Sequence, residues 1–410
     1  MRIITLATVT MVAITMVAIT IAAMTMLKMI LQKTPRRRIH RRTIAILVFS
    51  LAIPLPVLAE IETETLTVET FKDAGPHGIL VNSLFSNVAE IFNADTGKML
   101  GQLSLGAWSN SVEIDKENKL FHVAETYLSR HTRGERTDVV TSYDFETFTA
   151  KHEVKIPNKH ASGSPHSSHT GLTDDARFML VNNISPAMSI SVVDLHNSKF
   201  VGEIATAGCG LVYPVGDRAF LQLCGDGTVQ LISLKKDGSE KSRVRSEHFF
   251  NVDEDPVMEK AVRTDKGWVF ATFRGELFQV SVKGESITIE ALFNLDMDDE
   301  GWRMGGMQSI AYHAASDLLL TLMHQGGEHT HKDPGTEVWV FNLSDKRLLH
   351  RMKLENMATA IAVSQDSNPL IYSTFIEGIS LDIYDLRTGK KINSIDNVGV
   401  TPTIIQNLQL

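Results

Sequence analysis

Cysteine is scarce in this chain of 410 residues, which contains only Cys209 and Cys224. Two thiols are too few for a disulfide-dense scaffold, a four-cysteine zinc module or a cysteine-ligated iron–sulfur cluster. The sequence also lacks a glycine-rich phosphate loop, a Gly-x-Ser-x-Gly turn and a His-Glu-x-x-His pattern. The usual signatures of nucleotide binding, serine hydrolysis and zinc peptidases are therefore missing.

Excess positive charge and helical periodicity are missing as well. The formal net charge of −8 argues against nucleic acid as the main partner. From Glu60 onward no long stretch repeats its apolar residues with a 3.6-residue period, which is the pattern of amphipathic helices. With 43% hydrophobic and 21% charged residues, the chain can still bury a sizeable core.

The N-terminal 59 residues read as a leader. A basic segment (36–42), an apolar run (44–53) and the small-residue pattern ending at Ala59 form a signal-peptide core over 36–59, with cleavage after Ala59. Such a leader predicts export, and we expect a periplasmic protein. The uncharged stretch within residues 1–28 is long enough to span a bilayer. It is a membrane anchor, part of a bipartite leader, or the result of a start codon assigned upstream of Met29.

Removing the leader makes the chain more acidic. Residues 1–59 hold eight basic groups and no acidic one, so the remainder has 32 basic and 48 acidic residues, a net charge of −16. This charge suits small cationic molecules or a partner with a complementary patch. The same net charge is equally consistent with surface charge that only keeps the protein soluble.

Residues 60–410 contain a repeat of short β-rich runs separated by polar turns. The unit recurs seven times, with a spacing of about 50 residues, at 91–98, 142–146, 192–195, 231–234, 277–280, 340–343 and 383–390. This period is typical of propeller blades, in which four short antiparallel strands pack against neighbouring blades in a closed ring. We predict an all-β fold, a seven-bladed β-propeller formed as a single domain by residues 60–410. The wide gap between the fifth and sixth copies predicts an insertion that includes 296–300 and 326–331.

The two cysteines are expected to form a disulfide. If Gly216-Asp217 is a two-residue hairpin loop, Val215 faces Arg218 and Cys209 lies directly opposite Cys224. Side chains at opposed positions are close enough to bridge, and export supplies an oxidising compartment. The alternative is two free buried cysteines. Pro214 within the first strand suggests an outer edge strand or an irregular hairpin.

Histidines form two clusters that raise the possibility of a metal site. One comprises His160, His166 and His169, and the other His324, His329 and His331. His-x-His spacing on a strand places two rings on one face, where they can bind zinc or copper. An alternative function is therefore a periplasmic zinc or copper carrier. The competing interpretation is a set of loop histidines in contact with water.

Two acidic runs and one tryptophan are weaker candidates. Residues 253–255 and 298–300 could serve as paired acid–base carboxylates, although such runs are more often solvated loops. Trp108 follows Gly106-Ala107 in a turn, where it either lines a ligand entrance or packs as a blade anchor. No self-contained catalytic site is evident, and we assign no catalytic or metal-binding residue.

Several motifs, taken in order, give the chain a family resemblance. They are 129–138 (SRHTRGERTD), 185–187 (SPA), the Cys209 to Gly227 hairpin, 301–306 (GWRMGG), 311–313 (AYH), 331–332 (HK) and 363–366 (VSQD). In this order they resemble the heavy chain of quinoprotein amine dehydrogenases, of the methylamine or aromatic amine dehydrogenase type. The resemblance extends from about residue 75 to the end of the chain.

The resemblance implies a division of labour between subunits. Such heavy chains are periplasmic seven-bladed propellers, two of which bind two small disulfide-rich light chains in a heterotetramer. The light chain carries the tryptophan tryptophylquinone cofactor, so none is expected in this chain. A primary amine is oxidised to an aldehyde and ammonia, and electrons pass to a blue-copper protein or a cytochrome c.

The resemblance also implies a residue at the mouth of the substrate channel. The family places a phenylalanine there, in the loop after the first Asp-x-Thr-Gly-Lys-like turn. Here the matching loop has Ala107 and Trp108 and no phenylalanine. We expect Trp108, with Ala107 beside it, to form the gate and to change which amine side chain fits.

Overall fold

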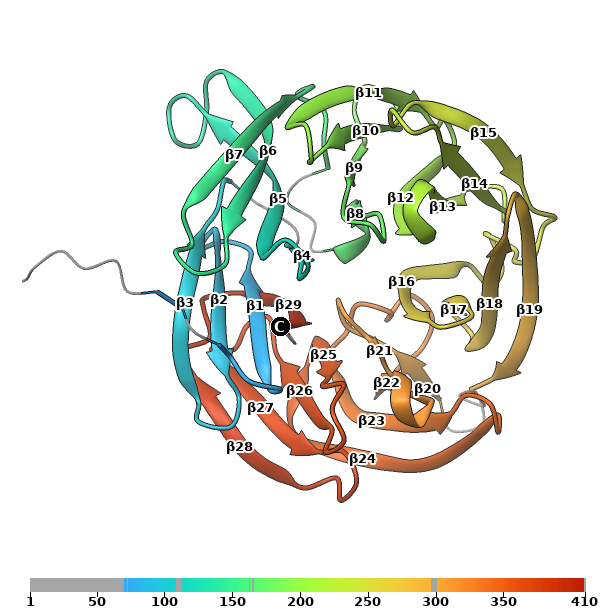
Figure 1. Ribbon diagram of the computed structural model, residues 1–410. Helices are drawn as coiled ribbons and strands as arrows, with labels where there is room; N and C mark the ends of the chain where they lie inside the picture. Colours follow the sequence, from blue (N-terminus) through green and yellow to red (C-terminus); the bar gives the residue numbers. More distant parts are fainter. Residues whose placement is uncertain are drawn as a thin grey trace, which may run out of the picture. The chain divides into compact units, whose positions relative to one another are not determined.

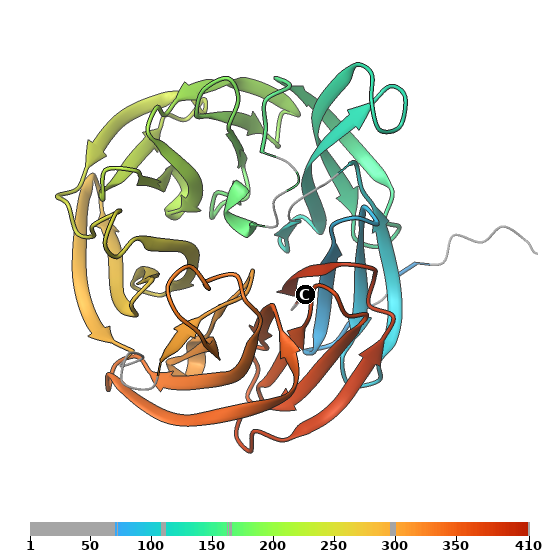
Figure 2. The ribbon, with the colours of Figure 1, turned by 180° about the vertical axis from the view of Figure 1, so that it is seen from behind.

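The fold is a ring of seven β-sheets around a central axis (Figures 1 and 2). The computed structural model describes residues 70–408, except for 72, 108–111, 162, 164–165 and 296–300. The predicted leader, with its cleavage site, lies outside the described residues. No helix among those that are described is long and apolar enough to cross a membrane.

Each sheet is antiparallel and forms one blade. Listed from the axis outward, the first blade has β29 (Pro402–Asn407), β1 (Gly78–Ser83), β2 (Val88–Asn93) and β3 (Lys98–Ser104). The second blade has β4 (Glu113–Asp115), β5 (Leu120–Leu128), β6 (Arg136–Asp144) and β7 (Ala150–Ile156). The third blade has β8 (Thr170–Leu172), β9 (Phe178–Asn183), β10 (Ser189–Asp194) and β11 (Lys199–Ala205). The next two are β12 (Cys209–Pro214), β13 (Ala219–Cys224), β14 (Val229–Leu234), β15 (Glu240–Arg245); and β16 (Val257–Thr264), β17 (Gly267–Thr272), β18 (Glu276–Lys283), β19 (Ser286–Asn294).

The sixth blade has five strands, and the seventh again has four. They are β20 (Trp302–Met304), β21 (Ile310–His313), β22 (Leu318–Gln325), β23 (Gly335–Asn342), β24 (Arg347–Ala358); and β25 (Ala360–Val363), β26 (Leu370–Thr374), β27 (Ser380–Asp385), β28 (Lys391–Asp396). Short 3-10 turns are η1 (Ser167–His169), η2 (Gly216–Arg218) and η4 (Ala314–Ser316). β20 and β21 pair with successive parts of β22, and residues 326–331 of the predicted insertion lie in the long connection between β22 and β23. Residues 296–300, the other predicted part, lie outside the described residues.

The seven repeats recognised in the sequence are the third strands of the seven blades. They fall on β2, β6, β10, β14, β18, β23 and β27. A third strand is covered on both sides by neighbouring blades, and every residue of β10 and β14 is buried. Outer strands such as β15 alternate between half-buried and exposed residues because one face meets solvent. The predicted seven-bladed all-β propeller is confirmed.

The C-terminal strand closes the ring. β29 pairs with β1 and supplies the innermost strand of the first blade. The Gln308 side chain reinforces this closure: its Nε2 donates to the Ile405 carbonyl (2.9 Å), and its Oε1 accepts the Ile405 N–H (2.8 Å). Meanwhile the Gln308 carbonyl accepts the N–H of Ile361 at the start of the seventh blade (2.9 Å). One residue therefore links three consecutive blades.

The disulfide between Cys209 and Cys224 is present, as predicted, and the cysteines are opposed in the β12–β13 register. The hairpin differs in detail. Its turn is η2, so Val215 donates to the Ala219 carbonyl (2.9 Å) instead of facing Arg218. A bulge between Gly210 and Tyr213 offsets this longer turn and restores the cysteine register. The hairpin is irregular, as Pro214 suggested, but β12 is the innermost strand and not the outer edge.

The two faces of the ring differ in the length of their connections. Because successive strands run in opposite directions, connections alternate between the two faces. On one face, which we call the short-turn face, every connection has two to six residues. The opposite long-loop face carries every connection of seven residues or more: 105–112, 129–135, 157–169, 246–256, 295–301 and 326–334. Of the candidates named above, Ala107, the described histidines of both clusters and residues 253–255 belong to this face or its strand ends.

Candidate functional site

The predicted gate begins in a well-anchored loop. The Gly106 N–H donates to Glu125 Oε1 (2.6 Å), and the half-buried Ala107 donates its N–H to the Thr126 carbonyl (2.8 Å). A Cβ on Gly106 would lie 2.9 Å from both Glu125 Cβ and the Thr126 oxygen, so the position requires glycine. Trp108 lies outside the described residues, and its role as a gate stays a prediction.

Glu125 is a buried residue that the sequence analysis missed. It is fully inaccessible, and the Tyr143 hydroxyl lies 3.1 Å from both of its carboxyl oxygens. Burial raises the pKa of Glu125, and the hydrogen bonds from its neighbours oppose that rise only in part. The signal in the sequence was an acidic residue in the middle of an apolar strand.

The first histidine cluster does not assemble as a metal site. His160 Nδ1 binds Asp138 Oδ2 (2.9 Å), and Arg136 donates two hydrogen bonds to the same carboxylate (2.6 and 2.7 Å). Burial alone would raise the pKa of Asp138, but His160 and Arg136 outweigh it and hold the pKa at about 2. This ion cluster joins β6 to the start of the 157–169 loop.

The remaining histidines also lack a ligand arrangement. His166 Nε2 lies 3.5 Å from Glu259 Oε1, and its ring packs edge-on against His169 with centroids 5.2 Å apart. His324 is buried between Gly305 and Gly326, and the ring of His331 packs edge-on against the ring of Phe273. Within the described parts of the chain, no group of three His, Cys, Asp or Glu side chains is placed to hold a metal ion.

The structure describes one of the two acidic runs, residues 253–255. Asp253 and Glu254 are exposed, and Asp255 accepts the Arg274 N–H (2.7 Å). These are contacts of a solvated loop. Residues 298–300 lie outside the described part of the chain.

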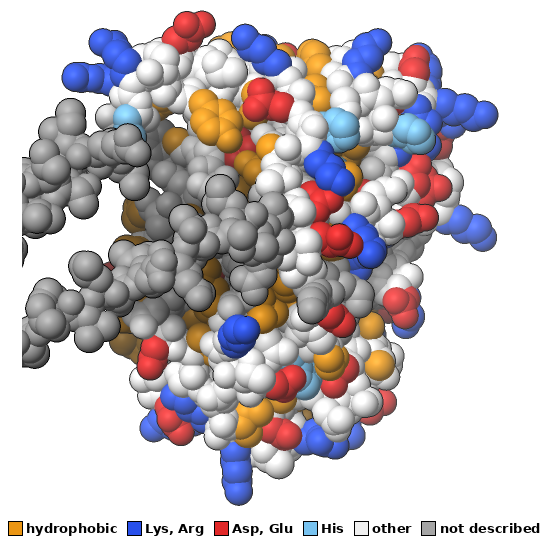
Figure 3. Space-filling view, turned by 60° about the vertical axis from the view of Figure 1, so that its left-hand side comes forward, with side chains coloured by type: hydrophobic (Ala, Val, Ile, Leu, Met, Phe, Trp, Pro, Cys, Tyr) orange, Lys and Arg blue, Asp and Glu red, His pale blue; other side chains and the backbone are white. Residues whose placement is uncertain are grey.

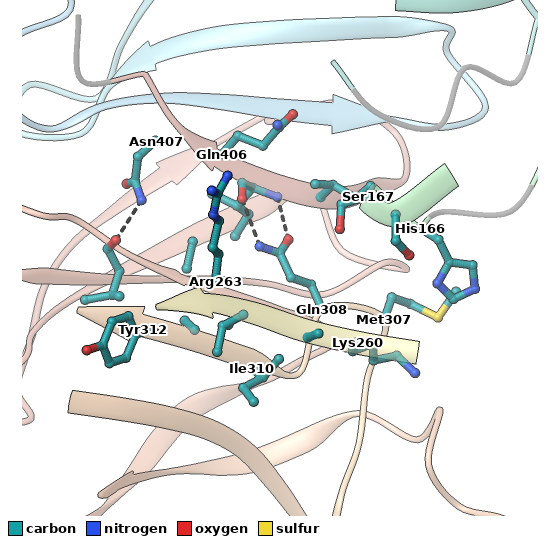
Figure 4. Close-up of a pocket in the computed structure, with 18 of the residues that line it drawn as sticks. His166, Ser167, Lys260, Arg263, Met307, Gln308, Ile310, Tyr312, Gln406 and Asn407 are labelled. Atoms are coloured by element: carbon teal, nitrogen blue, oxygen red, sulfur yellow. Dashed lines mark hydrogen bonds between the residues drawn. The ribbon is translucent and has the colours of Figure 1, made fainter. Parts of the chain in front are cut away.

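Two adjoining cavities, which we call the channel, are lined largely by residues of the innermost strands. Their volumes are about 480 and 230 Å³, and they share Ser167, Glu259, Arg263, Trp268 and Gln406 among their walls. Figure 4 shows a pocket with Ser167, Arg263 and Gln406 in its wall. Lys260 Nζ lies 3.1 Å from Glu259 Oε1. Burial opposes ionisation of Glu259, yet Lys260 and His166 lower its pKa to about 2.

Glu113 adds a carboxyl of a different kind to the smaller cavity. Thr170 Oγ1 donates to its Oε1 (2.5 Å), which joins the innermost strands of two neighbouring blades. Burial raises the pKa of Glu113 to about 7, against the small opposing effect of the Thr170 hydrogen bond. This acid therefore titrates in the physiological range.

Large apolar side chains are exposed on the long-loop face. Phe85, Ile379 and Val400, which we call the apolar patch, are 66%, 55% and 64% exposed. Their loops are joined by hydrogen bonds from the Phe85 N–H to Thr401 Oγ1 (2.9 Å) and from the Val398 N–H to the Ile379 carbonyl (2.9 Å). The exposed side chains of Tyr127, Ile184, Val252 and Met357 lie at loops or strand ends of the same face.

The loop that carries Phe85 is hydrogen-bonded to the gate loop, because the Leu105 N–H donates to the Asn87 carbonyl (2.8 Å). On the side of the ring shown in Figure 3, Lys and Arg side chains are interspersed with Asp and Glu among the coloured atoms.

One pair of indoles lies inside the sixth blade. The rings of Trp302 and Trp339 have centroids 5.4 Å apart, and the Arg351 guanidinium lies over both rings at 4.7 and 4.4 Å. Both tryptophans are buried in the core formed between the fifth and sixth blades. Packing accounts for this pair, which lines neither channel cavity.

Comparison with known proteins identifies the family. The methylamine dehydrogenase heavy chain (MADH) family matches residues 79–409. The methylamine dehydrogenase heavy chain of Paracoccus versutus is 31% identical over 322 residues, covering 77% of this chain and 74% of that protein. The heavy chain of Methylorubrum extorquens is 28% identical over 330 residues, covering 78% and 80%.

A solved structure supports the fold alone. A functionally unknown protein from Desulfotomaculum acetoxidans superposes with a TM-score of 0.56 at 13% identity, covering 80% of this chain and 98% of that one. The sequence matches carry further, because they extend across all seven blades at up to 31% identity. This chain belongs to the methylamine dehydrogenase heavy chain family.

Proposed function

We propose that the chain is the heavy subunit of a periplasmic quinoprotein amine dehydrogenase. In this proposal, two copies bind two small light chains, each carrying tryptophan tryptophylquinone. The quinone supplies the oxidation of a primary amine to an aldehyde and ammonia, and electrons leave to a blue-copper protein or a cytochrome c. The propeller holds the light chain and shapes the approach to the cofactor.

The apolar patch is the observation that carries this proposal. Exposed clusters of large apolar side chains on a soluble domain mark interaction sites. Here they lie on the face that has the long loops, and hydrogen-bonded loops connect them to the predicted gate at Ala107. A light chain seated on the long-loop face would bury the patch and bring its cofactor to the gate loop.

The gate proposal concerns substrate choice. The Glu125 carboxylate fixes the backbone at Gly106, so the segment that follows starts from a defined position. We expect Trp108→Ala to change the ratio of kcat/KM between a short and an aromatic amine with little loss of stability. An unchanged ratio would remove Trp108 from the gate.

Two features support export. The leader pattern at residues 36–59 is that of a signal peptide, and the Cys209–Cys224 disulfide suits an oxidising compartment. Fractionation of the source cells, followed by N-terminal sequencing of the mature chain, tests this. The expected first residue is Glu60, in the periplasmic fraction.

Expression with and without a light chain tests the proposal as a whole. The chain alone should reduce no dye in the presence of amines, and its mass should match its sequence with one disulfide, leaving Trp302 and Trp339 uncrosslinked. Co-expressed with a small cysteine-rich chain from a neighbouring reading frame, it should purify as a complex with a visible quinone spectrum. Amine-dependent dye reduction by the single chain would refute the subunit assignment.

A further inference from the structure

The smaller channel cavity contains acceptors that lack donors. Glu113 Oε1 receives the Thr170 hydroxyl, but Oε2 accepts no hydrogen bond from the described residues. Gln406 Nε2 donates to the Val112 carbonyl (2.7 Å), whereas its Oε1 is buried with no partner among those residues. Both side chains line the cavity of about 230 Å³. A ligand that donates hydrogen bonds would satisfy both.

Glu113 also lacks a counter-charge. The cations that line the channel already have carboxylate partners: Lys260 pairs with Glu259 at 3.1 Å, and Arg263 makes two 2.6 Å hydrogen bonds to Asp174. No other described cation lies within ion-pair distance of Glu113. Glu113 is half-buried. A carboxylate that is partly removed from water without a counter-charge is stabilised either by protonation or by a cation.

The cavity walls suit a cation of a particular size and kind. Tyr213 and Trp268 form an aromatic corner, with ring centroids 5.2 Å apart, that can contact an alkyl group or a diffuse positive charge. Ser168 adds a hydroxyl to the wall. These groups match a compact cation with N–H donors on one side and a small apolar part on the other.

We propose that this part of the channel, between β4, β8 and β16, binds a small ammonium cation through the carboxylate of Glu113. The ligand class is ammonium itself or a short primary alkylammonium. The site lies where β4 begins, directly after the loop that carries Trp108. It does not depend on the proposed enzymatic role, although an amine dehydrogenase would meet both kinds of cation.

Several titratable groups surround the site and must be considered in any pH experiment. His122 is the register partner of Glu113 and is bound to Ser142 (2.8 Å) and near Asp115 (3.4 Å). The other groups on the adjoining elements are His166, His169, Tyr213, Glu259 and Arg263. Burial lowers the pKa of His166, which favours the neutral form of its ring.

Calorimetric titration of the purified chain tests the proposal. Ammonium chloride and methylammonium chloride are titrated separately at constant ionic strength, with sodium chloride and tetramethylammonium chloride as controls. One cation should bind per chain at pH 8, about tenfold more tightly than at pH 6, because the Glu113 carboxyl ionises near pH 7. The tighter of the two ammonium salts identifies the preferred ligand. Equal heats from tetramethylammonium, which has no N–H, would overturn the proposal.

Substitutions test whether Glu113 forms the cation site. Glu113→Gln should abolish binding, whereas Glu240→Gln, which changes an exposed carboxylate beside Arg243, should leave it unchanged. Binding by Glu113→Gln at the affinity of the unaltered chain would refute the assignment. If Glu113→Gln does not fold, Thr170→Val keeps the carboxylate but removes its hydrogen bond, and the pH of half-maximal binding should rise. An unchanged midpoint would equally refute it.

Discussion

At the scale of single residues, two buried carboxyls and the half-buried Glu113 show how the surroundings of an acid decide its charge. Asp138 touches Arg136 and His160, and its pKa falls to about 2. Glu125 receives hydrogen bonds from neutral groups and its pKa rises, while Glu113 has one hydroxyl partner and a pKa of about 7. The first joins β6 to a loop, the second fixes the backbone at Gly106, and the third is the carboxyl of the proposed cation site.

Asp138→Asn tests the first of these roles. Removing the carboxylate leaves the Arg136 guanidinium without its counter-charge and the His160 ring without its hydrogen-bond partner, so the free energy of unfolding at pH 7 should fall by about 3 kcal/mol. The folded pKa of Asp138 lies below its ordinary 3.8, so its contribution exists above pH 4 and is lost as pH falls toward 2. The difference between the two proteins in urea unfolding should therefore shrink by about 2 kcal/mol across that range.

An exposed acid provides the control. Asp253→Asn, on the 246–256 loop, should change stability by less than about 0.5 kcal/mol at either pH. An Asp138→Asn protein as stable as this control at pH 7 would show that the ion cluster contributes nothing.

The partner of Glu113 was not predictable from the sequence, because Thr170 is 57 residues away in the chain and lies on the next blade. For Glu125 the sequence offered only the signal of an acidic residue within an apolar strand. The same holds for the histidines: clustering along the chain suggested a metal site, whereas His160 faces Asp138 and His166 faces Glu259.

At the scale of elements, strands that are buried on both faces could be predicted from the sequence, and the short innermost strands could not. Third strands are buried on both faces, so their apolar runs repeat visibly and indicated seven blades. The innermost strands β4 and β8 have three residues each and line a polar channel, which leaves no pattern to detect. The cysteine pairing was correct even though the turn was longer than predicted, because the bulge in β12 compensated.

Ring closure can be tested at Gln308. Gln308→Ala removes both side-chain hydrogen bonds to Ile405, so urea unfolding should show a loss of about 2 kcal/mol. Amide exchange in β29 should accelerate at the same time, since this strand joins the last blade to the first. Gln102→Ala, on the exposed outer strand β3, is the matched control and should change neither quantity. Unchanged exchange in β29 would mean that its pairing with β1 alone secures the ring.

At the scale of the whole molecule, the two faces of the ring differ in the length of their connections, and we propose that only one of them binds the light chain. Short turns on one face leave little surface for a partner. The other face combines long loops, the anchored gate backbone and the apolar patch. The sequence indicated the long loops individually, but it could not show that they share one face, because that follows from strand direction around the closed ring.

Charged substitutions in the apolar patch test this asymmetry. Phe85→Asp with Val400→Asp should weaken light-chain binding at least about thirtyfold, as expected when central apolar contacts are lost. Ile392→Asp is the control, because Ile392 is similarly exposed (56%) but lies on the outer strand β28. Equal affinities of the two variants, measured by titration of the light chain, would place the interface elsewhere.

Hydrogen exchange of the chain with and without its light chain tests the central claim most directly. We predict slower exchange on binding in the loops 83–88, 105–107, 374–380 and 396–402, with no change in the turns of the short-turn face. Protection confined to the short-turn face, or a catalytically active chain that binds no partner at all, would contradict this account.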